Sequence, residues 1–174
     1  LQADGIKEFP DCQALVGLGN LVESDQPDGR TRYRMYYTLL PGKKDPQWQT
    51  NGTWHVIEHK VCAAVESTDG IMWSNRQMIF DRRRDVDTED IGVVGLNVWK
   101  SGQQFRGIYT GLGTKFKTYS LCEATSDDGL VWNRGINGNN VSLKPEFGKW
   151  DSGMIGYPSV LVEDKGVRIF YNGA

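Results

Sequence analysis

The sequence predicts an all-β protein built from four-stranded antiparallel sheets, the blades of a β-propeller. Glycine accounts for 21 of the 174 residues, and aromatic residues make up 11% of the chain. Such a composition is typical of many short strands joined by tight turns. One pattern of strands and turns also recurs at intervals of roughly 60 to 70 residues. These observations predict propeller blades and no helix.

Each predicted complete blade contains a hairpin of one recognisable kind. Segments 65–73 and 124–132 share the pattern Ser-x-Asp-Gly-x-x-Trp, and a weaker copy surrounds Asp4-Gly5. An Asp-Gly pair favours a two-residue hairpin turn, because both central residues of that turn need a positive φ. The serine can hydrogen-bond the turn backbone. We expect Trp73 and Trp132 to pack into the core and hold the outer strand in place.

Two further strands precede each hairpin position. They are predicted within residues 19–38, 96–111 and 158–173, where apolar and polar residues alternate around a polar turn. This alternation is the period of a half-buried strand. One blade therefore consists of an inner strand, two middle strands and an outer strand, and the Asp-Gly turn leads to the outer one.

The repeat predicts a partial ring with two complete blades and two incomplete ones, all in one domain. We expect residues 1–10 to end a blade, 11–85 and 86–145 to form complete blades, and 146–174 to form the first half of another. Propellers use about four to eight blades around a common axis. We therefore expect the remainder of the ring to come from further sequence, a second chain or an oligomer.

Charge and hydropathy argue against two kinds of partner. Lys and Arg number 20 and Asp and Glu number 22, so the formal net charge is −2. That balance argues against binding to the backbone of a nucleic acid. The sequence also lacks an apolar run long enough to cross a membrane as a helix. We expect neither a nucleic acid nor a membrane as partner, and a soluble chain whose compartment, cytoplasmic or secreted, stays open.

The three cysteines are expected to be buried and reduced. They are Cys12, Cys62 and Cys122, an odd number that cannot all pair within the chain. His55 and His59 lie four residues apart on a predicted strand, which separates them by about 13 Å. The sequence therefore predicts no metal site and no cofactor.

The hairpin motif and the strand pair 156–160 and 169–173 resemble the five-bladed propeller glycosidases, which include glycoside hydrolase families 32, 43, 68 and 130. The resemblance covers nearly the whole chain. It implies a five-bladed ring that cleaves a glycosidic bond in an oligosaccharide or glycoside substrate. The Asn-Asp-Pro-Asn-Gly signature of the sucrose-cleaving enzymes and an Arg-Asp-Pro motif are both missing, which counts against the invertase branch.

An aspartate precedes each predicted inner strand by five or six residues. These aspartates are Asp11, Asp90 and Asp151, when the strands are aligned on Gly17, Gly95 and Gly156. Glycosidic cleavage needs two or three carboxylates around the sugar, one to protonate the leaving oxygen and another to act as nucleophile or to activate water. The three aspartates are therefore the predicted catalytic residues. The alternative is that each aspartate caps a loop and recurs because the blade recurs.

The resemblance also assigns individual roles. It implies that Asp90 lies in blade three, at the carboxylate that positions the substrate, and that Asp151 lies in blade four, at the general acid. That acid is usually Glu, so Asp151 departs from the pattern. The base or nucleophile belongs to the inner strand of blade one, which we expect to lie outside this chain.

Five further residues are predicted to contact the substrate: Glu89, Trp99, Glu123, Trp150 and Tyr157. Aromatic rings near the inner strands can stack on sugar faces. Glu89 adjoins Asp90. Glu123 replaces Ala64 of the matching strand, although a solvent-facing strand residue is the simpler interpretation.

The arginine-rich run 81–85 has two interpretations. It is expected to be a solvated loop whose charges compensate one another. The alternative is that its arginines bind a phosphate or a sugar acid through bidentate contacts.

Other functions remain open at this point. A non-catalytic glycan-binding propeller would keep the scaffold and the aromatic platforms without the acid pair. A glycoside phosphorylase would use phosphate in place of water. A sialidase-like propeller is less well supported, because in true Asp-boxes the glycine stands two residues after the aspartate, whereas here it follows directly.

Overall fold

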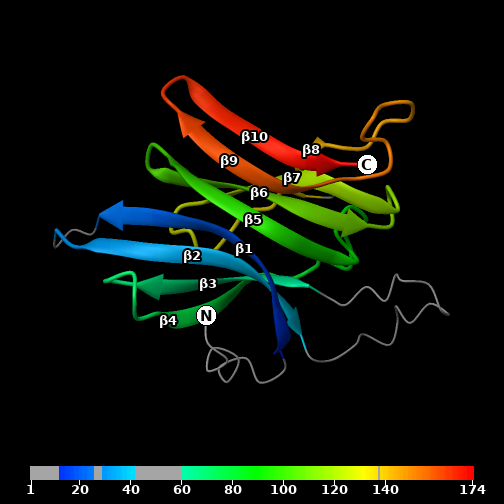
Figure 1. The fold of residues 1–174 in the computed structure, drawn as a ribbon. Helices are drawn as coiled ribbons and strands as arrows, with labels where there is room; N and C mark the ends of the chain where they lie inside the picture. Colours follow the sequence, from blue (N-terminus) through cyan, green and yellow to red (C-terminus); the bar gives the residue numbers. More distant parts are fainter. Residues whose placement is uncertain (1–11, 26–28, 42–59, 137) are drawn as a thin grey trace.

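The fold of the chain is known from a computed structural model, which describes residues 12–25, 29–41, 60–136 and 138–174 (Figure 1). These residues form ten strands and no helix. The first sheet contains β1 (Cys12–Asp25), β2 (Thr31–Pro41), β3 (Val61–Ser67) and β4 (Ser74–Phe80). The second contains β5 (Gly92–Ser101), β6 (Gln104–Gly113), β7 (Thr118–Ser126) and β8 (Val141–Leu143). The third contains β9 (Ile155–Glu163) and β10 (Gly166–Gly173).

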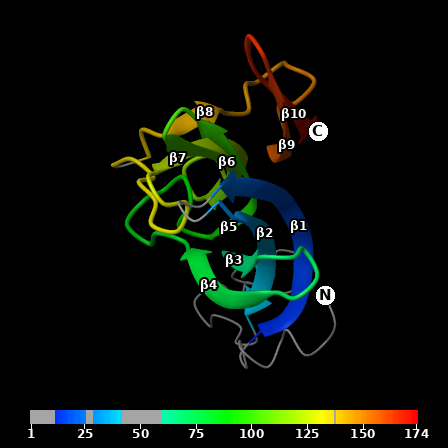
Figure 2. The ribbon, with the colours of Figure 1, turned by 90° about the vertical axis from the view of Figure 1, so that its left-hand side faces the viewer.

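The strands of each sheet pair in sequence order, and every pair is antiparallel. The prediction of an all-β chain with four-stranded antiparallel sheets is therefore confirmed. The three sheets follow one another from β4 at the bottom to β10 at the top in both views (Figures 1 and 2). Their first strands lie next to each other, since β1 contacts β5 and β5 contacts β9.

The main hydrophobic core lies between the first two sheets. Tyr36 and Phe80 from the first sheet pack there with Leu96 and Tyr109 from the second. The rings of Phe80 and Tyr109 meet edge to face, with centroids 4.9 Å apart. Aromatic residues thus supply much of the buried apolar area that holds neighbouring sheets together.

The tryptophans of the two hairpins pack as predicted. Trp132 is half-buried against the main core cluster, and Trp73 packs against a second cluster formed by residues of β2 and β3.

Cys62 and Cys122 are buried free thiols, as expected, and burial raises the pKa of each to about 12. The side chain of Cys12 lies outside the described residues. Among the described residues, no helix has the length and apolar character that a membrane crossing requires.

The strand register corrects the alignment of the inner strands. The residues that match are Gly17, Val94 and Gly156, which lie opposite Thr38, Thr110 and Asn172. Gly95 is therefore one position too far along the chain. In β5 and β9 one extra, bulged residue follows the matching position directly, whereas in β1 Leu18 still pairs with Tyr37 and the extra residue lies between Leu18 and Leu21. Such a bulge bends the strand locally.

The true counterpart of Gly95 is Tyr157. Both residues have a positive φ, 67° and 54°. Each also donates its backbone N–H to a threonine hydroxyl on the preceding sheet, Gly95 to Thr38 (3.0 Å) and Tyr157 to Thr110 (2.7 Å). These two hydrogen bonds fix how each inner strand lies on the sheet before it.

The Asp-Gly hairpin that follows β7 docks on the first sheet. Arg34 of β2 donates to the backbone oxygen of Asp128 (2.5 Å), and the Tyr36 hydroxyl donates to the backbone oxygen of Gly129 (2.9 Å). Arg34 is itself held by Glu66 of β3 (2.6 Å). The hairpin is closed by the Asp128 carboxylate, which accepts two backbone N–H bonds that lower its pKa. A hairpin of the second sheet thus latches that sheet to the first.

This latch leads to a prediction about two glycines. Gly129 and Gly70 have nearly the same positive φ (74° and 73°), but an added Cβ would overlap Arg34 and Tyr36 at Gly129 and meet nothing within 4 Å at Gly70. We expect Gly70→Ala to lower the free energy of unfolding by about 1 kcal/mol, the cost of the left-handed conformation. Gly129→Ala should cost about 2–4 kcal/mol, because the inter-sheet contact is also lost. Urea unfolding of both variants measures the difference, and equal losses would contradict the latch.

Candidate functional site

Asp151 stands on the turn that leads into β9. Its residue is only 7% exposed, and its Oδ2 accepts a hydrogen bond from the Tyr171 hydroxyl of β10 (2.9 Å). The same hydrogen bond raises the pKa of Tyr171, because ionising that hydroxyl would remove it. Within the described residues, Oδ1 of Asp151 has no hydrogen-bond partner. The carboxylate is therefore oriented through one oxygen and available through the other.

Trp150 provides an aromatic surface beside this carboxylate. Its side chain is 69% exposed, and its ring stacks on that of Tyr171, with centroids 5.8 Å apart and an angle of 19° between the planes. Gly173 of β10 lies directly beneath, since an added Cβ would overlap both Trp150 and Asp151. Glycine at this position lets the two side chains lie flat against β10. The outer face of the indole ring thus remains exposed next to Asp151.

Asp90 lies at the matching edge of the second sheet. Its two carboxylate oxygens accept bonds from the backbone N–H and the hydroxyl of Thr114, each 2.8 Å long. Thr114 belongs to the connection between β6 and β7, and Thr118 at the start of β7 donates to the backbone oxygen of Gly153 (2.7 Å). One hairpin therefore contacts both of the turns that carry Asp90 and Asp151. These two predicted catalytic residues lie at the same edge of adjacent sheets.

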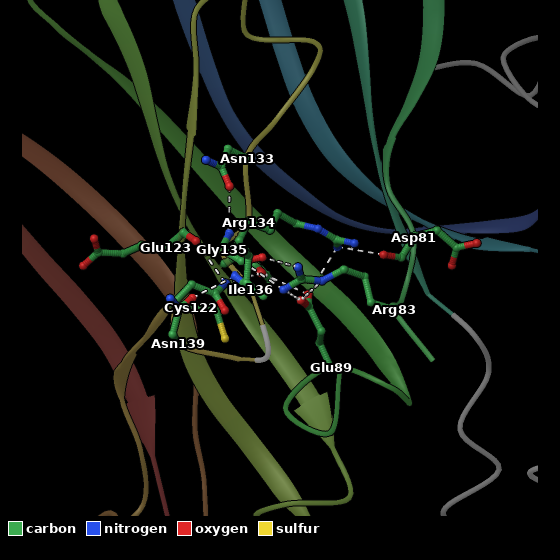
Figure 3. A network of polar contacts seen from close by, with 12 residues as sticks. Asp81, Arg83, Glu89, Cys122, Glu123, Asn133, Arg134, Gly135, Ile136 and Asn139 are labelled. Atoms are coloured by element: carbon green, nitrogen blue, oxygen red, sulfur yellow. Dashed lines mark hydrogen bonds and ion pairs between the residues drawn. The ribbon is translucent and has the colours of Figure 1, made fainter. Parts of the chain in front are cut away.

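Glu89 is fully buried between the first two sheets (Figure 3). Arg83 and Arg134 both form ion pairs with its carboxylate, and the Tyr109 hydroxyl donates to it (3.0 Å). Arg83 and Arg134 reach Glu89 from segments that precede and follow the second sheet's middle strands. Complete burial and three protein partners favour a structural role for Glu89 over the substrate contact predicted for it.

The corrected register shows that Glu89, not Asp90, is the counterpart of Asp151. Glu89 precedes Val94 by five residues, as Asp151 precedes Gly156. Each acid also accepts a hydrogen bond from a tyrosine on the next strand. The pairs are Glu89 with Tyr109 and Asp151 with Tyr171. The two acids differ in that Glu89 is neutralised by two arginines, whereas no ion pair of the described residues involves Asp151.

The other predicted contact residues have partners of their own. Trp99 is half-buried between the second and third sheets, nine residues beyond Asp90, roughly 25–30 Å along an extended strand. Glu123 is exposed on β7 and accepts a hydrogen bond from Ser142 of β8 (2.6 Å), and Figure 3 shows it pointing away from Glu89. Tyr157 is partly exposed, and its ring meets that of Tyr119 edge to face. Asp11 lies outside the described residues.

The expectation of a fully solvated arginine loop is wrong for two residues of the run 81–85. Arg82 is buried, and Arg83 both pairs with Glu89 and donates to the backbone oxygens of Arg134 and Gly135. Arg83 turns inward because it pairs with the buried carboxylate of Glu89. The balance of charges within the run 81–85 does not reveal this pairing. His55 and His59 lie outside the described residues. The residues that the structure describes contain no group of three or more potential metal ligands.

The residues that the sequence interpretation missed are the partners of the two acids. Arg83 and Arg134 come together on Glu89 from positions 51 residues apart in the sequence. Tyr109 and Tyr171 could have been found, because both stand one residue before matching positions of the repeat. The sequence signal that could have identified them is a tyrosine that recurs, together with an acid, at matching positions of the repeat.

Comparison with known proteins supports the fold. No family model matches the chain. An uncharacterized protein of Mycobacterium tuberculosis is 29% identical over 150 residues, which cover 84% of this chain and 44% of that protein. The chain therefore spans less than half the length of the curated relatives it matches.

Several solved structures share the fold of this chain, and three of them are described here. A family 117 glycoside hydrolase from the marine bacterium Zobellia galactanivorans matches with a TM-score of 0.67 and 14% identity, over 91% of this chain and 48% of that one. An N-acetylgalactosamine deacetylase from F. plautii, in complex with blood group B trisaccharide, matches with a TM-score of 0.59 and 15% identity, over 90% of this chain and 40% of that one. A family 43 β-xylosidase/α-arabinofuranosidase from a compost microbial metagenome, in complex with xylotriose, matches with a TM-score of 0.55 and 11% identity, over 91% of this chain and 44% of that one. The chain therefore has the fold of the propeller glycosidases that its hairpins and strand pairs resemble.

Proposed function

We propose that the chain forms part of a carbohydrate-active site of the glycoside hydrolase type, at the edge that carries Asp151 and Asp90. The observation that carries this proposal is the exposed indole face of Trp150 beside the free carboxylate oxygen of Asp151. An aromatic face and an adjacent carboxylate are the groups that hold a sugar ring and transfer a proton to its glycosidic oxygen. The fold, shared with carbohydrate-active enzymes, supports this interpretation.

In this proposal Asp151 exchanges a proton with the leaving oxygen through Oδ1, while the Tyr171 hydroxyl holds Oδ2 in place. Trp150 stacks on the sugar ring bound at the reacting bond. Asp90, held by Thr114, is the second carboxylate and positions the substrate. Asp11 remains a predicted third catalytic carboxylate with no role assigned to it, and Tyr157 a predicted contact.

The test is a panel of aryl-glycosides incubated with the chain in the presence and absence of phosphate. Release of the aryl alcohol without phosphate supports a hydrolase. Release that requires phosphate would point to a phosphorylase instead. No release under either condition, at protein concentrations where saccharide binding is measurable, would contradict the catalytic part of the proposal.

A second candidate is a non-catalytic glycan-binding protein. The observation in its favour is that Glu89 is neutralised by two arginines and that both oxygens of Asp90 bind Thr114, so that of these two described acids and Asp151, only Asp151 has an oxygen without a partner among the described residues. One free carboxylate is fewer than the pair that glycosidic cleavage uses. Saccharide binding without turnover of any aryl-glycoside is the result this candidate predicts.

Tyr171→Phe tests how the site positions Asp151. The substitution removes the hydroxyl that donates to Asp151 and keeps the ring that stacks on Trp150. We expect kcat to fall about tenfold, the effect of one lost hydrogen bond of about 1.4 kcal/mol, with little change in KM because the stacking surface remains. Steady-state kinetics on the best aryl-glycoside measures both. A rise in KM at unchanged kcat would assign Tyr171 to substrate binding instead of positioning.

A further inference from the structure

The described residues contain two copies of the Asp-Gly hairpin: the copy 126–132 docks on the neighbouring sheet, and the copy 67–73 does not. In the docked copy, Leu130 is half-buried against the main core cluster. The matching residue of the hairpin 67–73, Ile71, is 78% exposed. The next residue of each copy is exposed in both cases, Val131 at 78% and Met72 at 74%. Docking therefore buries one defined apolar side chain, and the bare hairpin presents that side chain to solvent.

The docked copy shows what this hairpin binds. Its two turn carbonyl oxygens accept hydrogen bonds from Arg34 and Tyr36, two residues apart on the second strand of the preceding sheet. The bare hairpin has the same internal hydrogen bonds, since the Asp69 carboxylate accepts the backbone N–H groups of Ile71 and Met72. It is therefore already folded for docking on a strand with an arginine and an aromatic residue at that spacing.

A strand of this kind is exposed at the other end of the molecule. Register places Arg168 and Phe170 of β10 at the positions of Arg34 and Tyr36, since Asn172 matches Thr38. Phe170 is 54% exposed, and the Arg168 side chain lies on the surface in an exposed pair with Glu163. An exposed ion pair of this kind is weak and exchanges readily. Three more apolar residues of the same sheet are also exposed, namely Leu161, Val162 and Val167.

The two surfaces cannot meet within one molecule. The hairpin 67–73 belongs to the sheet at the bottom of Figures 1 and 2, and β10 belongs to the sheet at the top. We propose that they bind each other between two copies of this chain, head to tail. Arg168 of one copy donates to the backbone oxygen of Asp69 of the other, and Ile71 packs on Phe170. The same contact formed twice closes a ring of two copies.

The charges of the two surfaces are complementary. Arg168 brings a guanidinium group, and Asp69 brings a carboxylate next to the carbonyl oxygen that accepts it. Phe170 lacks the hydroxyl of Tyr36, so this contact has one hydrogen bond fewer than its docked counterpart. The proposal does not depend on the carbohydrate site, because none of its four residues belongs to that site.

Sedimentation velocity of the intact chain tests the proposal. The expected species has about twice the 19.6 kDa mass of the chain. Ile71→Ser and Arg168→Ala should each give monomers, whereas Met72→Ser, the matched control in the same hairpin, should leave the dimer intact. A mixture of the Ile71→Ser and Arg168→Ala variants should form dimers again, because one intact contact is then available. That recovery also shows that both variants are folded.

Three results would overturn the proposal. The first is an unsubstituted chain that stays monomeric at every concentration, which would assign both surfaces to further blades of a longer protein. The second is a dimer that survives both substitutions. The third is a mixture of the two variants that remains monomeric while circular dichroism shows both to be folded.

Discussion

Replacing Glu89 by alanine is expected to lower the free energy of unfolding by about 3–5 kcal/mol, the cost of leaving buried charges without their partner. Arg83 and Arg134 would both lose their carboxylate, and the Tyr109 hydroxyl would lose its acceptor. Arg134 also lies over the ring of Phe80, 4.7 Å from its centroid, so the damage extends to the packing between the two sheets. Urea unfolding followed by tryptophan fluorescence measures the loss.

Glu123→Ala is the matched control for this experiment. Glu123 is a glutamate of the second sheet, but it is exposed, and its side chain binds only Ser142 among the described residues. Its loss should change the free energy of unfolding by less than about 0.5 kcal/mol. A Glu89→Ala variant as stable as this control would contradict the structural role assigned to Glu89.

Asp151→Asn is expected to reduce kcat/KM on an aryl-glycoside by about 10²–10⁴-fold, the usual contribution of a general acid or base. Asparagine keeps the size of the side chain and can still accept the Tyr171 hydrogen bond, but it cannot donate or take up a proton at the glycosidic oxygen. The fold should stay intact. Because asparagine removes the negative charge beside the Tyr171 hydroxyl, the raised pKa of Tyr171 should fall in the variant.

Asp164→Asn serves as the control for the loss of one acidic group. Asp164 lies exposed in the turn between β9 and β10. Its replacement should leave kcat/KM within about twofold of the unsubstituted chain. If Asp151→Asn retains activity at the level of Asp164→Asn, Asp151 is not the proton donor and the catalytic proposal fails.

The strands and hairpins could be predicted from the sequence because their signals are local. Alternating residues lie within the strands they specify, and the Asp-Gly pairs at Asp69-Gly70 and Asp128-Gly129 lie within turns. The two-residue turn expected at these pairs is wrong, because only the glycine of each pair has a positive φ and six residues separate β3 from β4. The inner-strand alignment failed by one residue, because an alignment on glycines selects Gly95, the bulged residue with a positive φ, although Val94 before it is the residue that matches Gly17. A bulge is set by pairing with the neighbouring strand, which the sequence of one strand does not contain.

The candidate site was predictable only in part, for the same reason. Asp151 and Trp150 could be selected because they stand just before an inner strand. Glu89 looked equally suitable, and only its burial with Arg83 and Arg134 separates it from Asp151. Those arginines come from segments on either side of the second sheet's middle strands, and no local pattern links them to Glu89.

The most direct test of the carbohydrate site is a calorimetric titration of the chain and of its Trp150→Ala variant with oligosaccharides. Phe147→Ala, which removes another fully exposed aromatic ring of the same segment, is the control. We expect saccharide binding to weaken about tenfold in Trp150→Ala, corresponding to about 1.4 kcal/mol for the lost stacking surface, and to stay unchanged in Phe147→Ala. Equal affinity of all three proteins for the saccharide would contradict a binding site at Trp150 and Asp151.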